Sequence, residues 1–247
     1  MVHARSPMHT AHPIADPFAL IQRALRWTKP FDAWPDRAVE GVADIARLER
    51  YDKRTQVLAR NREAREVLIV VSGCLEVSRV NSAGVKFVLT LLGAGEVVAL
   101  IRLLPELPLH YDYHAHVDTV LLHLPSDDLR AVLDAHPILW RDIAFLAMSR
   151  QSDSIVLLQQ RALGGLQQGV AQTILKLLTW YGETTDEPQS VRLRLSQNDL
   201  ASMLSVTRQT MNKELRELST LGLISIDYGR LIVRDADGLQ AVASQGS

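Results

Sequence analysis

The chain has 247 residues, enough for one large domain or two smaller ones. Hydrophobic residues make up 47% and charged residues 22%, a balance that excludes disordered and collagen-like chains. No apolar run approaches the roughly 20 residues that a membrane-spanning helix needs, and the N-terminal segment lacks the apolar core of a signal peptide. With Cys74 as its only cysteine, the chain has no disulfide framework or iron–sulfur site, and we expect a cytoplasmic protein that binds no membrane.

Charge is distributed unevenly along the chain. The formal net charge is −1, yet the segment from Arg192 to Arg234 has seven Lys and Arg against four Asp and Glu. A near-neutral chain with a local basic excess is typical of a protein that docks on DNA through one face.

The first half of the chain changes from helical to strand patterns. After an N-terminal extension (residues 1–30) that includes a short amphipathic helix, apolar residues recur with helical period over Arg37–Leu48. From about residue 51 to 124, short apolar or alternating runs are separated by turns such as Ser72-Gly73 and 81–84. This spacing predicts a small antiparallel barrel or roll, with Cys74 as a small core residue.

The middle of the chain is helical. Ser126 is a favourable N-cap, and Pro137 begins the longest helical stretch, which runs to about Leu163. A helix of about 40 Å is either a core helix or a dimer seam. Its apolar positions are Leu139, Ile143, Leu146, Ala147, Val156 and Leu157. Gly164-Gly165 ends this helix as a natural hinge, and a further helix over 170–180 precedes an exposed connector at 182–190.

Two short helices joined by a tight turn are predicted near the C-terminus. Ser196 caps the first, with Asp199 three residues later, and Ser205-Val206 is the turn. Thr207 caps the second, which runs from Arg208 to about residue 221 and whose buried face is Met211, Leu215 and Leu218. Strands over 223–227 and 230–233, joined by Tyr228-Gly229, complete a winged helix-turn-helix.

The exposed face of the second helix has side chains suited to a DNA major groove. Basic and amide side chains there contact base edges and phosphates; they are Arg208, Gln209, Asn212, Lys213 and Arg216. An ordinary helical hairpin with a charged outer face is the alternative. The wing and the local basic excess favour DNA binding.

At this point the sequence resembles the CRP/FNR transcription regulators over about residues 35–240. The matching motifs are Val70-Val-Ser-Gly73, Leu75-Glu-Val77, Leu92-Gly-Ala-Gly-Glu96, His136-Pro137, Val170-Ala-Gln-Thr173, Leu195-Ser-Gln-Asn-Asp-Leu-Ala201 and Val206-Thr-Arg-Gln-Thr210. The resemblance implies an α+β chain with an N-terminal antiparallel β-roll (double-stranded β-helix), a long dimerisation helix and a C-terminal winged helix-turn-helix. The expected domains are the extension (1–30), a sensor roll (31–135), the dimerisation helix and hinge (136–165) and a DNA-binding domain (166–247).

The resemblance also implies roles for individual residues. Arg208 is the best-matched base reader, Gln209 and Lys213 replace a frequent Glu and Arg, and Asn212 and Gln197 lie on the same surface. Hydroxyls placed to bond phosphates are those of Ser196, Thr207 and Thr210. Such a regulator binds a palindromic double-stranded DNA site as a homodimer and contacts RNA polymerase.

The chain departs from the cyclic-AMP-binding members of that family. Ala99 and Leu100 replace the Gly-Glu pair that holds the ribose, and Leu109 and His110 replace the Arg-Ser pair at the phosphate. Because a buried phosphodiester without a cation is costly, we expect an effector other than cyclic AMP. The inferred pocket is apolar with aromatic hydroxyls, which suits a small organic effector, and is lined by Val98, Leu100, Tyr111, Tyr113, Ser154 and Leu158. A regulator with no effector at all remains an alternative.

A histidine-rich segment offers a further alternative. His110, Asp112, His114 and His116 alternate and would share one strand face, a donor set that suits a metal or haem. The family match places Tyr111 and Tyr113 inward and the histidines outward, so we expect a solvated face and no metal or cofactor. A cupin-like metal-dependent enzyme would need more ligands, for which Asp118 and His123 are poor substitutes.

Overall fold

The computed structural model describes residues 17–60, 65–84, 86–184, 191–193, 196–204, 206–227 and 230–244. Internal contacts divide the chain into two compact units, residues 1–77 with 92–144 and residues 78–91 with 145–247. Within the described ranges, no helix combines the length and the apolar character needed to cross a membrane. The predicted order of a β-roll, a long helix and a winged helix-turn-helix is confirmed.

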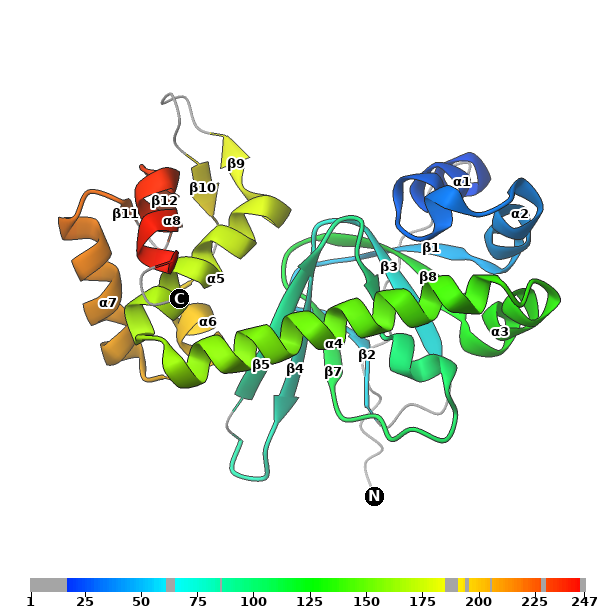
Figure 1. Cartoon of the computed structure of the whole chain (residues 1–247), viewed down its shortest axis with the longest axis horizontal. Helices are drawn as coiled ribbons and strands as arrows, with labels where there is room; N and C mark the ends of the chain where they lie inside the picture. The colour runs from blue at the N-terminus through cyan, green and yellow to red at the C-terminus, as the bar shows by residue number, and fades with distance from the viewer. Residues whose placement is uncertain are drawn as a thin grey trace, which may run out of the picture. The chain divides into compact units, whose positions relative to one another are not determined.

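Three helices pack at one end of the first unit: α1 (Pro17–Trp27), α2 (Asp36–Ile45) and α3 (Ser126–Ala135), with the 3-10 turn η1 (Phe31–Ala33) between the first two (Figure 1). The prediction that the second helix runs to Leu48 is wrong. Leu48 lies in a strand, paired with Leu122. The predicted cap at Ser126 is also wrong. Ser126 is the first residue of α3, and its buried hydroxyl has no hydrogen-bond partner among the described residues.

The β-roll consists of two four-stranded sheets. The first has the order β1-β8-β3-β6, from β1 (Arg47–Tyr51), β8 (Thr119–Pro125), β3 (Glu66–Ser72) and β6 (Val97–Val98). The second has the order β2-β7-β4-β5, from β2 (Gln56–Leu58), β7 (Asp112–Ala115), β4 (Cys74–Val80) and β5 (Lys86–Gly93). The short 3-10 helix η2 (Leu100–Leu103) follows β6.

The roll's core lies between the two sheets, toward which alternate side chains of the strands point. Residues from both sheets form one cluster: Tyr51, Val57, Leu58, Leu68, Val70, Leu75, Val77, Val98, Ala99, Tyr113, Ala115 and Leu121. All are less than a tenth exposed. The unbroken apolar run Val67–Val71 predicts a buried strand; Val67–Val70 are fully buried, and Val71 is half-buried.

Cys74 begins β4 and is buried, as predicted. Burial raises the pKa of its thiol to about 12, and the thiolate is the form that reacts. We therefore expect iodoacetamide at pH 8 to leave Cys74 unmodified in the native protein and to alkylate it after unfolding in urea, as measured by intact mass. Alkylation of the native chain at the rate of the unfolded chain would contradict this.

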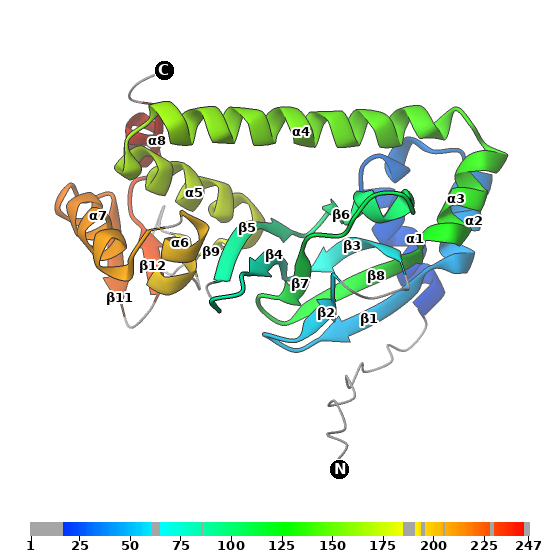
Figure 2. The same cartoon turned by 90° about the horizontal axis from the view of Figure 1, so that it is seen from below.

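Helix α4 (Leu139–Leu163) is a single uninterrupted helix (Figure 2). Of the apolar positions expected along it, Leu139 and Ile143 are buried within the chain and Ala147 is exposed. A different set of large apolar side chains is exposed, namely Phe145, Met148 and Ile155. The side chains of residues 156–163 lie outside the described residues.

Besides most of α4, the described part of the second unit contains four further helices and a small sheet. The helices are α5 (Leu166–Tyr181), α6 (Gln197–Met203), α7 (Arg208–Thr220) and α8 (Ala236–Ser244). The sheet has the order β11-β12-β10-β9, from β11 (Ile224–Asp227), β12 (Arg230–Val233), β10 (Val191–Leu193) and β9 (Glu183–Thr184). The expected exposed connector therefore contains strand β9, and α8, which packs against α5, was not predicted.

Candidate nucleic-acid interface and effector site

Helix α6 begins at the predicted residue because both halves of a capping box form. The Ser196 hydroxyl accepts a hydrogen bond from the backbone N–H of Asp199 (3.1 Å), and the Ser196 backbone N–H donates to Asp199 Oδ2 (3.2 Å). Leu200, Ala201 and Met203 are buried, as a helix packed against α7 requires. Leu195 and Ser205 lie outside the described residues.

Helix α7 is positioned by its own cap and its apolar face. The Thr207 hydroxyl accepts from the backbone N–H of Thr210 (3.1 Å). The three residues predicted to face inward are at most 1% exposed; they are Met211, Leu215 and Leu218. Fixing both the start of the helix and its buried face determines which side chains point outward.

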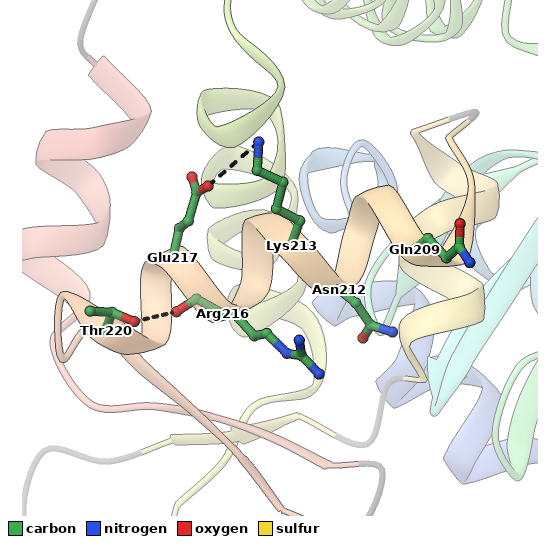
Figure 3. Close-up of a pocket in the computed structure, with 6 residues that line it drawn as sticks. All are labelled: Gln209, Asn212, Lys213, Arg216, Glu217 and Thr220. Atoms are coloured by element: carbon green, nitrogen blue, oxygen red, sulfur yellow. Dashed lines mark hydrogen bonds and ion pairs between the residues drawn. The ribbon is translucent and has the colours of Figure 1, made fainter.

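The outward face of α7 forms a shallow groove, lined by Gln209, Asn212, Lys213, Arg216, Glu217 and Thr220 (Figure 3). Arg208 and Gln209 at its first turn are exposed, and Asn212 is half-buried. The Lys213 ammonium lies 3.9 Å from the Glu217 carboxylate. Arg216 lies along the same groove, so the face has three cationic side chains within nine residues.

The three predicted phosphate-binding hydroxyls differ in what they can donate. Ser196 donates its only hydroxyl proton to Asp199 Oδ2 at 2.6 Å, so a phosphate could receive that proton only if this bond broke. The Thr207 and Thr210 hydroxyls are 2.9 Å apart and share one hydrogen bond. One proton of this pair is therefore left to donate to a phosphate oxygen. Gln197, at the first turn of α6, is half-buried.

The predicted wing is an antiparallel hairpin in which Ile226 pairs with Leu231 and Ile224 with Val233. Its turn at Tyr228-Gly229 lies outside the described residues. Strand β10 pairs with β12, so the wing is the edge of a larger sheet. At the base of the hairpin, Arg234 Nε donates to the Ser225 hydroxyl (3.0 Å), which fixes this arginine beside β11.

In the roll, three of the predicted effector-site residues lie together. Val98 and Tyr113 belong to the core cluster, and Tyr111 packs against it. Leu100 is half-buried at the start of η2. Ser154 belongs to α4 in the other unit, where it is exposed and its hydroxyl donates to the Arg150 carbonyl (2.8 Å). The side chain of Leu158 lies outside the described residues, so the part that α4 plays in this site stays a prediction.

Sequence reasoning missed the charged group inside the roll, Arg102. Its side chain is fully buried, and its guanidinium lies over the Tyr113 ring with 5.5 Å between Cζ and the ring centroid. Burial lowers the pKa of this guanidinium from its usual range. The assumption that the roll holds no cation is therefore wrong. The available signal was a single charged residue within an otherwise apolar run of eight residues, Val97–Leu104.

The four polar residues of the histidine-rich segment do not share one solvated strand face. Strand β7 contains only Asp112 and His114 of the four polar residues, and His116 is buried with its Nδ1 3.8 Å from Glu76 Oε2. His123, the other histidine considered, is buried between the Tyr51 hydroxyl (2.9 Å) and Glu66 Oε2 (3.1 Å). Over the described ranges, no three His, Cys, Asp or Glu side chains come close enough to hold a metal ion.

Comparisons with known proteins match both halves of the chain. Residues 48–136 match the cyclic nucleotide-binding domain family and residues 168–242 the Crp-like helix-turn-helix domain family, together more than half of the chain. The HTH-type transcriptional regulator Cmr of Mycobacterium tuberculosis is 28% identical over 83% of this chain and 80% of its own length. The Cyclic AMP receptor protein of Thermus thermophilus is 26% identical over 71% of this chain and 78% of that protein.

Solved structures share the fold. A CRP/FNR-family transcriptional regulator from Thermus thermophilus superposes with a TM-score of 0.69 at 21% identity, covering 81% of this chain and all of that one. The matched family models, the fold and the capped helix-turn-helix agree on one family. The chain belongs to the CRP/FNR family of DNA-binding transcription regulators.

Proposed function

We propose that the protein binds a palindromic DNA site as a homodimer, with α7 of each copy in the major groove. The observation that supports this most directly is the exposed face of α7, where Arg208, Lys213 and Arg216 lie on a helix whose start and buried side are both fixed. Arg208 would bond a guanine edge through two N–H groups and Gln209 an adenine. Two-fold symmetry would place the half-sites about one helical turn apart.

The exposed side of α4 supports the dimer. Phe145, Met148 and Ile155 are 74%, 69% and 56% exposed in the single chain. With Ser152, which is also exposed, they follow the 3-4-3 spacing of a coiled-coil seam, nearly opposite the buried Leu139 and Ile143. Apolar side chains exposed on one stripe favour burial against a second copy. The dimerisation role predicted for this helix is kept in the proposal, with these exposed residues as its seam in place of the apolar positions expected from the sequence.

The Phe145→Glu variant is therefore expected to weaken the dimer at least tenfold, because each copy would bury a carboxylate in an apolar seam. Sedimentation equilibrium over a range of concentrations measures the dissociation constant. Ala147→Glu is the matched control, since Ala147 is exposed on the same helix but lies between the buried side and the stripe. Equal weakening by both variants would assign the effect to charge alone and would contradict this seam.

The function is tested by selecting DNA from a random pool with the purified full-length chain. The expected result is enrichment of a palindrome with half-sites about one helical turn apart. An asymmetric consensus would contradict the dimeric arrangement, and an absence of enrichment with and without cell extract would contradict DNA reading by α7.

We also propose that an effector in the roll regulates DNA binding, as a population shift between arrangements related by the hinge at Gly164-Gly165. The proposed domains are those of the sequence: a sensor roll (31–135), a dimerisation helix and hinge (136–165) and a DNA-binding domain (166–247). RNA polymerase is the proposed protein partner by family resemblance. An effector-independent regulator would show DNA affinity that no small molecule alters.

A further inference from the structure

Arg102 has more hydrogen-bonding capacity than its surroundings use. Its Nη2 donates to the Ala59 carbonyl oxygen at 2.8 Å. Among the described residues, its Nε and Nη1 have no hydrogen-bond partner, although the side chain is 0% exposed. These two nitrogens carry three of the five N–H donors of a guanidinium. Buried polar groups are almost always hydrogen-bonded, so a buried cation with free donors calls for a functional explanation.

Apart from the Tyr113 side chain, which hydrogen-bonds the guanidinium and favours its charged form, the groups around Arg102 leave its charge uncompensated. None of the ion pairs found in the described part of the chain includes it. The carboxylate of Glu66, which acts on Arg102 through space, is itself paired with Arg47 and His123. The neighbouring Arg65 adds a second positive charge, and its own guanidinium donates to the carbonyls of the loop at Leu104, Pro105 and Leu107.

The same position lies at the predicted effector site. Tyr113, whose ring the guanidinium covers, is buried in the core cluster with Val98 and Leu58, and Leu58 pairs with Tyr113 across β2 and β7. A ligand at this point would meet one cation, one aromatic ring and apolar side chains. That combination suits a molecule with a single negative charge on an apolar body.

We propose that Arg102 anchors the carboxylate of a small, otherwise apolar organic acid bound in the roll, with Tyr113 beside it. This deepens the proposed function, since it rests on the roll being the effector site. The carboxylate oxygens would accept from Nε and Nη1 and would neutralise the buried guanidinium. A carboxylate matches the single charge of Arg102. A doubly charged phosphate monoester would need a second cation, and the neighbouring Arg65 guanidinium already donates to the carbonyls of the loop.

The test is thermal unfolding of the full-length chain with benzoate, 4-hydroxybenzoate, phenylacetate or hexanoate, each compared with its neutral amide. At a hundredfold excess over Kd, a bound carboxylate should raise Tm by about 5 °C or more, and its amide should not. Arg102→Met should abolish the shift, and Arg102→Lys should keep part of it because the cation remains. Arg50→Met removes an exposed arginine from β1 of the same roll and should leave the shift intact.

The ligand-free variants provide an independent readout. Arg102→Met removes a buried, unneutralised charge and should raise Tm, whereas a purely structural arginine would lower it. If Arg102→Met does not fold, Arg102→Lys provides the test instead. The proposal then requires that the carboxylates raise the Tm of this variant by less than they raise that of the wild-type chain. The proposal would be overturned if none of the four carboxylates raised the Tm of the wild-type chain, or if a carboxylate raised the Tm of Arg102→Met as much as that of the wild type.

Two further measurements distinguish a carboxylate ligand from a phosphate ligand, and this inference from the proposed function. An Arg102-dependent shift with cyclic AMP or inorganic phosphate, without any carboxylate response, would overturn the carboxylate assignment in favour of a phosphate ligand. The wild-type chain is tested in parallel on random-pool DNA. DNA enrichment without a carboxylate response overturns this inference alone, whereas loss of enrichment under all conditions contradicts the proposed function whatever the roll binds.

Discussion

Replacing Arg208 with alanine is expected to weaken binding to the selected palindrome by about 1–3 kcal/mol for each half-site, and by about twice that for a dimer. Arg208 is the first residue of α7 and is exposed, so its truncation disturbs neither the Thr207 cap nor the buried face. The loss should be confined to the correct sequence, because a base contact distinguishes specific from non-specific DNA. Titration of both DNAs at one fixed salt concentration measures the difference.

The selected consensus provides a second readout of the same variant. When Arg208→Ala is used in the random-pool selection, one symmetric pair of positions should lose its base preference while the others keep theirs. Arg50→Ala is the matched control, because it removes the same charge from an exposed position in the roll. A uniform loss of affinity without relaxed specificity would place Arg208 on the phosphate backbone and would contradict its role as a base reader.

Lys213 lies on the same face but is not equivalent to Arg208. Its ammonium is 3.9 Å from Glu217, so contact with DNA must compete with this exposed ion pair, which is worth at most about 1 kcal/mol. If Lys213 contacts a phosphate, Lys213→Ala lowers the slope of log K against log salt by about one per contact and leaves the consensus unchanged. If it contacts a guanine, the consensus relaxes at a second pair of positions.

The accuracy of the sequence predictions follows from where the determining interactions lie. Helices α6 and α7 begin at the predicted residues because Ser196 and Thr207 form their caps within three residues along the chain. Leu48 was wrongly assigned to a helix because the three- and four-residue spacing of apolar side chains continues into β1. There, pairing with Leu122, 74 positions away, determines the conformation. Strands as short as β9 and β10 leave too few residues for any alternating pattern.

The proposed effector site shows a second reason why the sequence alone does not predict every residue of a site. The apolar wall and Tyr113 could be inferred because alternation along a strand determines which side chains face inward. Arg102 was not inferred, because a lone arginine is normally expected at the surface even when its neighbours in the sequence are apolar. The left-handed backbone at Ala99 (φ 64°) immediately precedes the 3-10 turn that contains Arg102. That local conformation is not apparent from any spacing of apolar residues.

Gly73→Ala is expected to destabilise the roll by about 3 kcal/mol or more, lowering Tm by about 6 °C or more. Gly73 joins β3 to β4 with φ +86°, a conformation that disfavours any Cβ. An added Cβ would lie 2.3 Å from the Asp118 carbonyl oxygen and 2.8 Å from Thr119 Cα. Both are backbone atoms at the start of β8, so relief would require the strand itself to move.

Gly84→Ala separates the two contributions to the loss of stability in Gly73→Ala, which are the left-handed backbone conformation and the steric contact of the added Cβ. Gly84 has nearly the same backbone conformation, with φ +78°, but a Cβ there would meet nothing within 4 Å among the described residues. This variant should be destabilised only by the roughly 1 kcal/mol that the left-handed backbone conformation costs an alanine. Thermal and urea unfolding of the two variants therefore measures the steric contact at Gly73 by difference. Equal losses would show that β8 can shift to accept the methyl group, which would contradict the rigid β3–β4 turn inferred here.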